Sequence, residues 1–114
     1  MNKYTELSDF EINKAVFHKA KIKHKYFRFL PNGVITYNIK GKYQVFDPCN
    51  NPADAMPIII ENGIAIRPYK TATPVAFNAE IGEFYGHTIY NENVLRAAME
   101  LFLLMKDAEN SNGN

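Results

Sequence analysis

Residues 50–63 read NNPADAMPIIIENG, a helix-start signal followed by three consecutive isoleucines and a closing Asn62-Gly63. Asn51 is a good N-cap, and Pro52 suits the first helical position, where its missing N–H would have no helical partner in any case. Asn62-Gly63 predicts a left-handed residue that ends the helix. The segment therefore predicts a helix over residues 52–61 that carries its isoleucines into a core.

Pro57 complicates this helix, because a proline in a helix interior removes one backbone hydrogen bond and crowds the carbonyl of Ala53. Two readings stay open. Either the helix kinks at Pro57, or Asp54 is the true N-cap and Pro57 lies in the first turn.

Upstream, Ser8 to Glu11 form a capping-box pattern in which the Ser8 hydroxyl accepts from the Glu11 N–H. This pattern predicts a helix over residues 9–20. Three aromatic and β-branched runs separated by Gly turns then predict antiparallel strands. They cover residues 26–30, 34–39 and 43–46.

Downstream, residues 64–66 and 74–77 predict two further strands. Residues 80–90 are ambiguous and leave room for one more short strand. Asn93 caps a last helix that runs to about Lys106, where only Arg96 and Glu100 make a polar line. A helix this apolar is buried on most of its circumference, so we expect it to be central.

These elements predict an α+β fold of order α-β-β-β-α-β-β-α. We expect a mainly antiparallel sheet of four to five strands with the helices packed on one face. One domain should span residues 1–108, because 114 residues suit a single core. Residues 109–114 are polar and predict a disordered tail.

Composition narrows the cellular setting. The chain is 46% apolar, has no run near the roughly 18 residues of a membrane span, and begins without the apolar core of a secretory signal. Its one cysteine, Cys49, cannot form an internal disulfide, which fits a reducing cytoplasm, and it excludes a four-cysteine zinc site. We expect a cytoplasmic protein that does not enter membranes.

The net charge of +1 conceals a division along the chain. Residues 1–46 carry nine Lys and Arg against three Asp and Glu, a net charge of +6. Residues 47–114 carry four against nine, a net charge of −5. This asymmetry can mark a nucleic-acid-binding face. It can equally mark two oppositely charged faces that meet within one domain or across a dimer.

One basic segment is interleaved with Tyr26, Phe27 and Phe29. Its cations could neutralise phosphates while the exposed rings stack on unpaired bases. The alternative is a solvated helix end leading into a strand whose rings face the core. The candidate nucleic-acid-binding residues are Lys19, Lys21, Lys23, Lys25 and Arg28.

A second candidate site lies at helix starts. Asn50, Asn51 and Asp54 could mark an anion site, although Asp54 already occupies the positive end of the helix dipole and capping alone explains the pattern. Arg96 lies in a first turn, where the dipole disfavours a cation. It therefore predicts a compensating carboxylate, for which Asp54 and Asp47 are the candidates, and a structural ion-pair site.

Catalytic and metal-binding patterns are weak. His18, His24, His87 and Cys49 have no standard ligand spacing, and a Cys49–His87 nucleophile pair has no supporting base or oxyanion signature. No Walker loop, dinucleotide fingerprint or zinc-protease motif is present. The sequence predicts no metal, no cofactor and no catalytic residue.

Four collinear stretches together resemble NinX, a family of small proteins from lambdoid phages and prophages. They cover residues 7–14, 47–60, 61–66 and 93–99, about a third of the chain. The chain has Met56 where the family usually has Trp, Val94 where it usually has Pro, and Phe77 in place of Trp in a Trp-x-Ala pattern. The resemblance implies a phage-encoded accessory protein near phage replication, recombination or late gene control. It implies no catalytic residue.

We therefore expect a non-enzymatic module that binds a protein partner or a second copy of itself. The near-continuous apolar helix and the opposed charges favour this interpretation. The alternative is a weak nucleic-acid-binding protein that uses residues 19–28.

Overall fold

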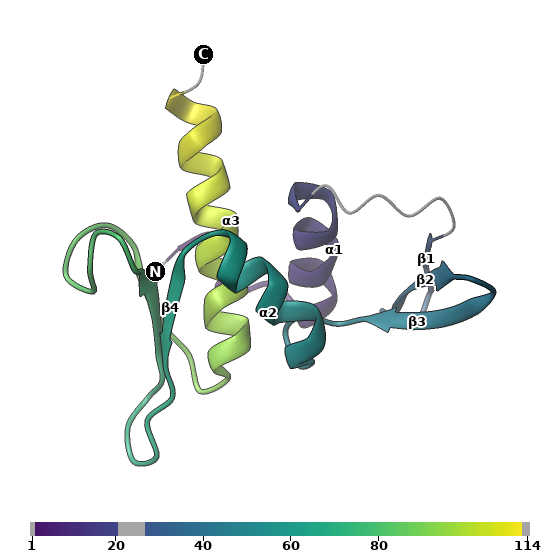
Figure 1. Cartoon of the computed structure of the whole chain (residues 1–114), viewed down its shortest axis with the longest axis horizontal. Coiled ribbons are helices and arrows are strands. Elements are labelled where there is room, and N and C mark those ends of the chain that lie inside the picture. Colours follow the sequence, from purple (N-terminus) through teal and green to yellow (C-terminus); the bar gives the residue numbers. More distant parts are fainter. Residues whose placement is uncertain (1, 21–26, 113–114) are drawn as a thin grey trace.

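The computed structural model describes residues 2–20 and 27–112. Three helices and two three-stranded antiparallel sheets make up this part of the chain (Figure 1). The elements are, in order, α1 (Asp9–Lys19), β1 (Phe27–Phe29), β2 (Ile35–Ile39), β3 (Lys42–Phe46), α2 (Pro52–Glu61), β4 (Ile64–Arg67), β5 (Val75–Asn78), β6 (Thr88–Tyr90) and α3 (Val94–Asn112).

The α+β class is confirmed, but the prediction of one four- to five-stranded sheet is wrong. One sheet has the order β1-β2-β3 and the other β4-β5-β6. The turn at residues 47–51 carries the chain from β3 into α2, so α2 separates β3 from β4 in space (Figure 1). The strands of each sheet are therefore consecutive in the sequence. β6 is the additional short strand for which residues 80–90 left room.

The prediction of a central last helix is confirmed. Helix α3 packs against α1, α2, β4, β5 and β6. All residues from Arg96 to Leu104 are buried, and Arg96 and Glu100 are the polar ones among them. Residues 96–104 of α3 are thus covered by the other elements.

Helix α3 also continues past its expected end near Lys106 to Asn112. The first glycine or proline after Asn93 is Gly113, so nothing in the sequence breaks the helix earlier. Residues 109–112 of the predicted tail are therefore helical, and residues 113–114 lie outside the described part.

The predicted N-caps of α1 and α2 are confirmed. Ser8 caps α1 and accepts from the Glu11 N–H at 3.1 Å, and Asn51 caps α2 and accepts from the Ala53 N–H at 3.0 Å. Pro57 lies inside α2, so the reading with Asp54 as N-cap is wrong. Gly63, with φ of 65°, ends α2 as expected.

The β1-β2-β3 sheet projects from the helices at one side of the molecule (Figure 1). Its base is anchored, because Phe29, Ile35 and Phe46 share a cross-strand row and Phe17 of α1 packs against both phenylalanine rings. Burial then falls along β2, from 1% exposure at Ile35 to 42% at Ile39. β2 is therefore well buried only near the base of the sheet.

Candidate functional site

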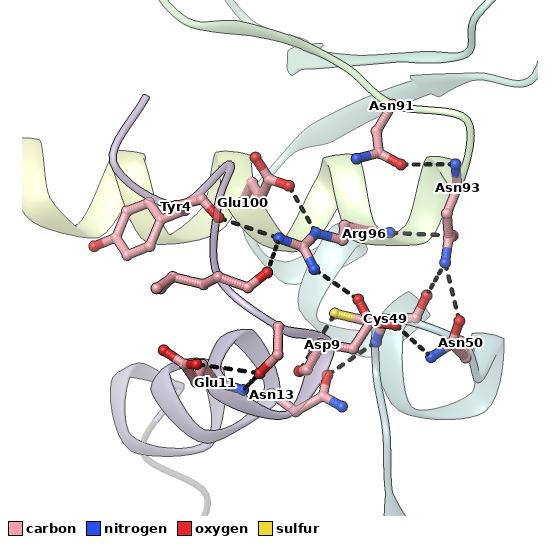
Figure 2. A network of polar contacts seen from close by, with 12 residues as sticks. Tyr4, Asp9, Glu11, Asn13, Cys49, Asn50, Asn91, Asn93, Arg96 and Glu100 are labelled. Atoms are coloured by element: carbon pink, nitrogen blue, oxygen red, sulfur yellow. Dashed lines mark hydrogen bonds and ion pairs between the residues drawn. The ribbon is translucent and has the colours of Figure 1, made fainter. Parts of the chain in front are cut away.

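Arg96 is the centre of the polar network that the shared motifs build (Figure 2). Its Nε donates to Glu100 Oε2 at 2.8 Å and its Nη1 to Asp9 Oδ1 at 2.7 Å. Its Nη2 donates to the carbonyl oxygens of Leu7 at 2.6 Å and Tyr4 at 3.1 Å. The guanidinium thus ties the N-terminal segment and α1 to the first turns of α3.

The expected carboxylate partners of Arg96 were wrong. Asp54 instead accepts from the Asp47 N–H at 2.9 Å, and Asp47 accepts from the Asn13 amide at 2.7 Å. The sequence did contain a signal for Glu100, which lies one helical turn after Arg96. It contained none for Asp9, which is 87 positions away.

Asn50 and Asn93 connect the second motif to α3. The Asn50 amide donates to Asp9 Oδ2 at 3.1 Å, and its side-chain oxygen accepts from the Asn93 amide at 3.0 Å. Asn93 also donates to the Cys49 carbonyl at 2.6 Å, while its own oxygen caps α3 by accepting from the Leu95 N–H. Three of the four shared stretches, residues 7–14, 47–60 and 93–99, therefore meet in this network.

Electrostatics follow from these contacts. Burial alone would raise the pKa of Asp9, but hydrogen bonds from Arg96 and Asn50 outweigh it and lower that pKa. Burial works against the charged form of Arg96 as well, yet Glu100 and Asp9 raise its pKa. Burial raises the pKa of Asp54, and hydrogen bonds from the Asp47 N–H and the Asn51 side chain only partly offset this effect. Arg96, Asp9 and Glu100 are thus a charged cluster held by mutual pairing.

The Arg96 network has few polar groups that are free to bind a ligand. Within residues 2–20 and 27–112, no buried side-chain nitrogen or oxygen lacks a hydrogen-bond partner. The same residues contain no group of His, Cys, Asp and Glu arranged to hold a metal ion. Cys49 is fully buried, and burial followed by the nearby Asp9 carboxylate raises its thiol pKa to about 12. The network therefore joins α1, the turn at residues 47–51 and α3, and we call it the clamp.

The other predicted residues lie elsewhere. Asn51 is exposed at the start of α2, Lys19 ends α1 half-buried, and Arg28 is exposed on β1. Lys21, Lys23 and Lys25 lie outside the described residues. Phe77 is buried in β5 with the Arg67 guanidinium 5.0 Å from its ring centre, and Met56 is half-buried in α2.

A family model described as "Bacteriophage P22, NinX" matches residues 3–106. The chain belongs to this family. No curated protein and no solved structure matches it. The NinX-family match includes α1, α2, all six strands, α3 up to residue 106, and all three stretches that form the Arg96 network. It supports a phage accessory protein, and none of the described helices is long and apolar enough to cross a membrane.

A second candidate site, made of exposed apolar side chains, lies in the turn between β5 and β6. The turn between β5 and β6 carries three exposed apolar side chains, Ile81, Phe84 and Tyr85. An apolar groove of about 310 Å³ is lined by Ile81 of this turn and by Leu101, Met105 and Ala108 of α3. We call Ile81, Phe84, Tyr85 and this groove the loop surface. Sequence reasoning missed it, because residues 80–90 were ambiguous and indicated only room for one more short strand.

Proposed function

We propose that this NinX-family chain is a non-enzymatic accessory module that binds a protein partner through the loop surface. The observation that carries the proposal is the pair Phe84 and Tyr85, which are 85% and 69% exposed in the same turn as Ile81, a residue that lines the apolar groove. Contiguous exposed apolar side chains beside a groove are typical of protein-binding sites. The partner we expect presents an apolar segment to the groove.

Hydrogen bonds fix the conformation of the turn between β5 and β6. The Gly82 N–H donates to the Asn78 carbonyl at 2.9 Å, and the Thr88 hydroxyl donates to the Glu83 carbonyl. Glu83 is also paired with Arg67 of β4. A loop fixed in this way presents its aromatic rings at a reduced entropic cost of binding.

The structure changes the basis of this proposal. Residues 96–104 of α3, whose apolar side chains first suggested a protein partner, are covered by the other elements, so they no longer support one. The loop surface supports one in its place. The fully bonded Arg96 network supports a structural role for the shared motifs.

Affinity capture from infected host lysate tests the proposal, with Phe84→Ser as the test variant and Ile60→Ser as the matched control. Ile60 is an exposed apolar residue on α2, away from the loop in sequence and element. We expect wild type and the control to retain one protein that Phe84→Ser loses, and the purified protein to reproduce this order in direct binding. Equal retention by all three would contradict the proposal. Light scattering over a concentration series identifies a second copy of the chain as the partner, if self-association is lost in Phe84→Ser.

Nucleic-acid binding is the second candidate function. The observation that favours it is the projecting β1-β2-β3 sheet, on which Arg28 of β1 is exposed (Figure 1). A gel-shift titration at about 50 mM salt with single- and double-stranded DNA tests it. Absence of any shift at high micromolar protein would remove this candidate.

A further inference from the structure

The β1-β2-β3 sheet has an outer face that does not face α1. Strand register places Arg28, Thr36 and Val45 in one cross-strand row, and Asn38 and Tyr43 in the next row of the same face. The row of Phe29, Ile35 and Phe46 lies on the opposite face, because successive side chains along a strand alternate. The inner face thus meets Phe17, and the outer face meets solvent.

Two large side chains are exposed on this outer face. Tyr43 is 64% exposed and Val45 54% exposed, both on the edge strand β3. A flat aromatic ring presented on an exposed strand can stack on an unpaired base, and such stacking tolerates any base sequence.

The sheet has no negative charge of its own. No Asp or Glu occurs from Ile12 to Phe46, a stretch that holds eight Lys and Arg. None of the ion pairs found in the described residues involves Arg28, Lys40 or Lys42. The first carboxylates after the sheet, Asp47 and Asp54, lie at its base, where they accept hydrogen bonds from Asn13 and from the Asp47 N–H. The sheet therefore presents uncompensated positive charge.

A lysine occupies the tip of the sheet at a conformational cost. Lys40 and Gly41 form the two-residue turn between β2 and β3, with φ of 51° and 83°. Lys40 is the non-glycine residue with positive φ in the described chain. Turns of this kind favour Asn-Gly, because asparagine tolerates the left-handed region better than lysine does. Stability alone would thus favour asparagine at position 40.

We propose that the outer face and tip of this sheet bind single-stranded nucleic acid. Arg28 on the outer face and Lys40 at the tip contact phosphates, and Tyr43 stacks on a base. The inference rests on the second candidate function above and gives it a surface other than residues 19–25. Single strands are favoured over duplex because the ring of Tyr43 needs an unstacked base.

The test measures binding of a fluorescently labelled oligothymidylate by anisotropy, together with thermal unfolding of each variant. Lys40→Asn should raise the unfolding midpoint yet weaken binding, and it should reduce the log–log salt slope by about 0.7. Tyr43→Ser should weaken binding roughly 5- to 150-fold, as expected for loss of one stacked base. Tyr69→Ser, at an exposed tyrosine outside the sheet, is the matched control and should bind like wild type.

The possible results of this test distinguish failure of the proposed binding surface from failure of nucleic-acid binding as a function. If wild type does not bind, both nucleic-acid binding and this surface are wrong. If wild type binds, Lys40→Asn and Tyr43→Ser bind equally well, and Lys21→Ala/Lys23→Ala does not bind, the function stands and this surface is wrong. Equal affinity for polyglutamate would also overturn the inference, because the sheet would then be a general anion binder. So would tighter binding to duplex that is indifferent to Tyr43→Ser.

Discussion

Arg96 Nη1 donates to Asp9 Oδ1 at 2.7 Å, which joins the first turn of α3 to the first residue of α1 across 87 positions of sequence. The contact places a cation near the start of α3, where the helix dipole opposes it, and a carboxylate at the start of α1, where the dipole favours it. The pairing therefore offsets an unfavourable position with a favourable one. It also fixes how the first and last helices lie against each other (Figure 2).

Replacing Arg96 by Met should destabilise the protein by about 3–5 kcal/mol. The variant leaves Glu100 buried without its cation and removes the donors to the Tyr4 and Leu7 carbonyls. Urea unfolding followed by circular dichroism measures the change. A loss below about 1 kcal/mol would show that the network contributes little to stability.

A double-mutant cycle separates the ion pair from the other contacts of Arg96. We expect Arg96→Met/Glu100→Met to lose less stability than the sum of the two single variants, because both single variants break the same ion pair: Arg96→Met leaves Glu100 buried without its cation, and Glu100→Met leaves Arg96 with Asp9 as its carboxylate partner. Additive losses would mean that Arg96 acts mainly through Asp9 and the backbone carbonyls.

Acid should weaken the clamp through Asp9. The folded-state pKa of Asp9 is lowered from its ordinary value of 3.8, so its contribution is present above that value and is lost as pH falls through the lowered pKa. Asp9→Asn should therefore be less stable at neutral pH and should show a shallower loss of stability below about pH 4. Urea midpoints across that pH range measure both effects. Parallel curves for wild type and variant would contradict the assignment.

The two asparagine caps should differ in importance. Asn51→Ala removes one capping bond at an exposed helix start and should cost about 1 kcal/mol. Asn93→Ala also leaves the Cys49 carbonyl without its 2.6 Å donor, so it should cost roughly 2–3 kcal/mol. Chemical unfolding of both variants gives the comparison, and equal losses would show that the Cys49 contact is unimportant.

Local signals were enough for the helices and hairpins. Capping residues such as Ser8 and Asn51 fix helix starts through bonds within a few residues, and glycine turns fix where strands reverse. Sheet membership has no such signal. Whether β3 pairs with β4 depends on where α2 lies, and that depends on burial of Ala55, Ile58 and Ile59.

The candidate site divides in the same way. The importance of Arg96 could be predicted, because a cation in the first turn of an apolar helix needs a partner. Its choice of Asp9 over Asp54 could not, because the two carboxylates occupy similar helix-start positions in sequence. Only packing of α1 against α3 brings Asp9 within reach.

Cys49 gives a probe of how firmly the network holds. The thiol is fully buried, donates to the Asp9 carbonyl at 3.9 Å, and has its pKa raised to about 12 by burial and then by the Asp9 carboxylate. The reactive species toward alkylating reagents is the thiolate, so the native thiol should be almost inert at pH 8. Iodoacetamide labelling followed by mass spectrometry should then proceed only through opening of the structure. We expect Asn93→Ala to label faster than wild type, because it frees the Cys49 carbonyl, and Ile60→Ser to label like wild type. Rapid labelling of the native wild type would show that the turn at residues 47–51 opens without unfolding of the domain.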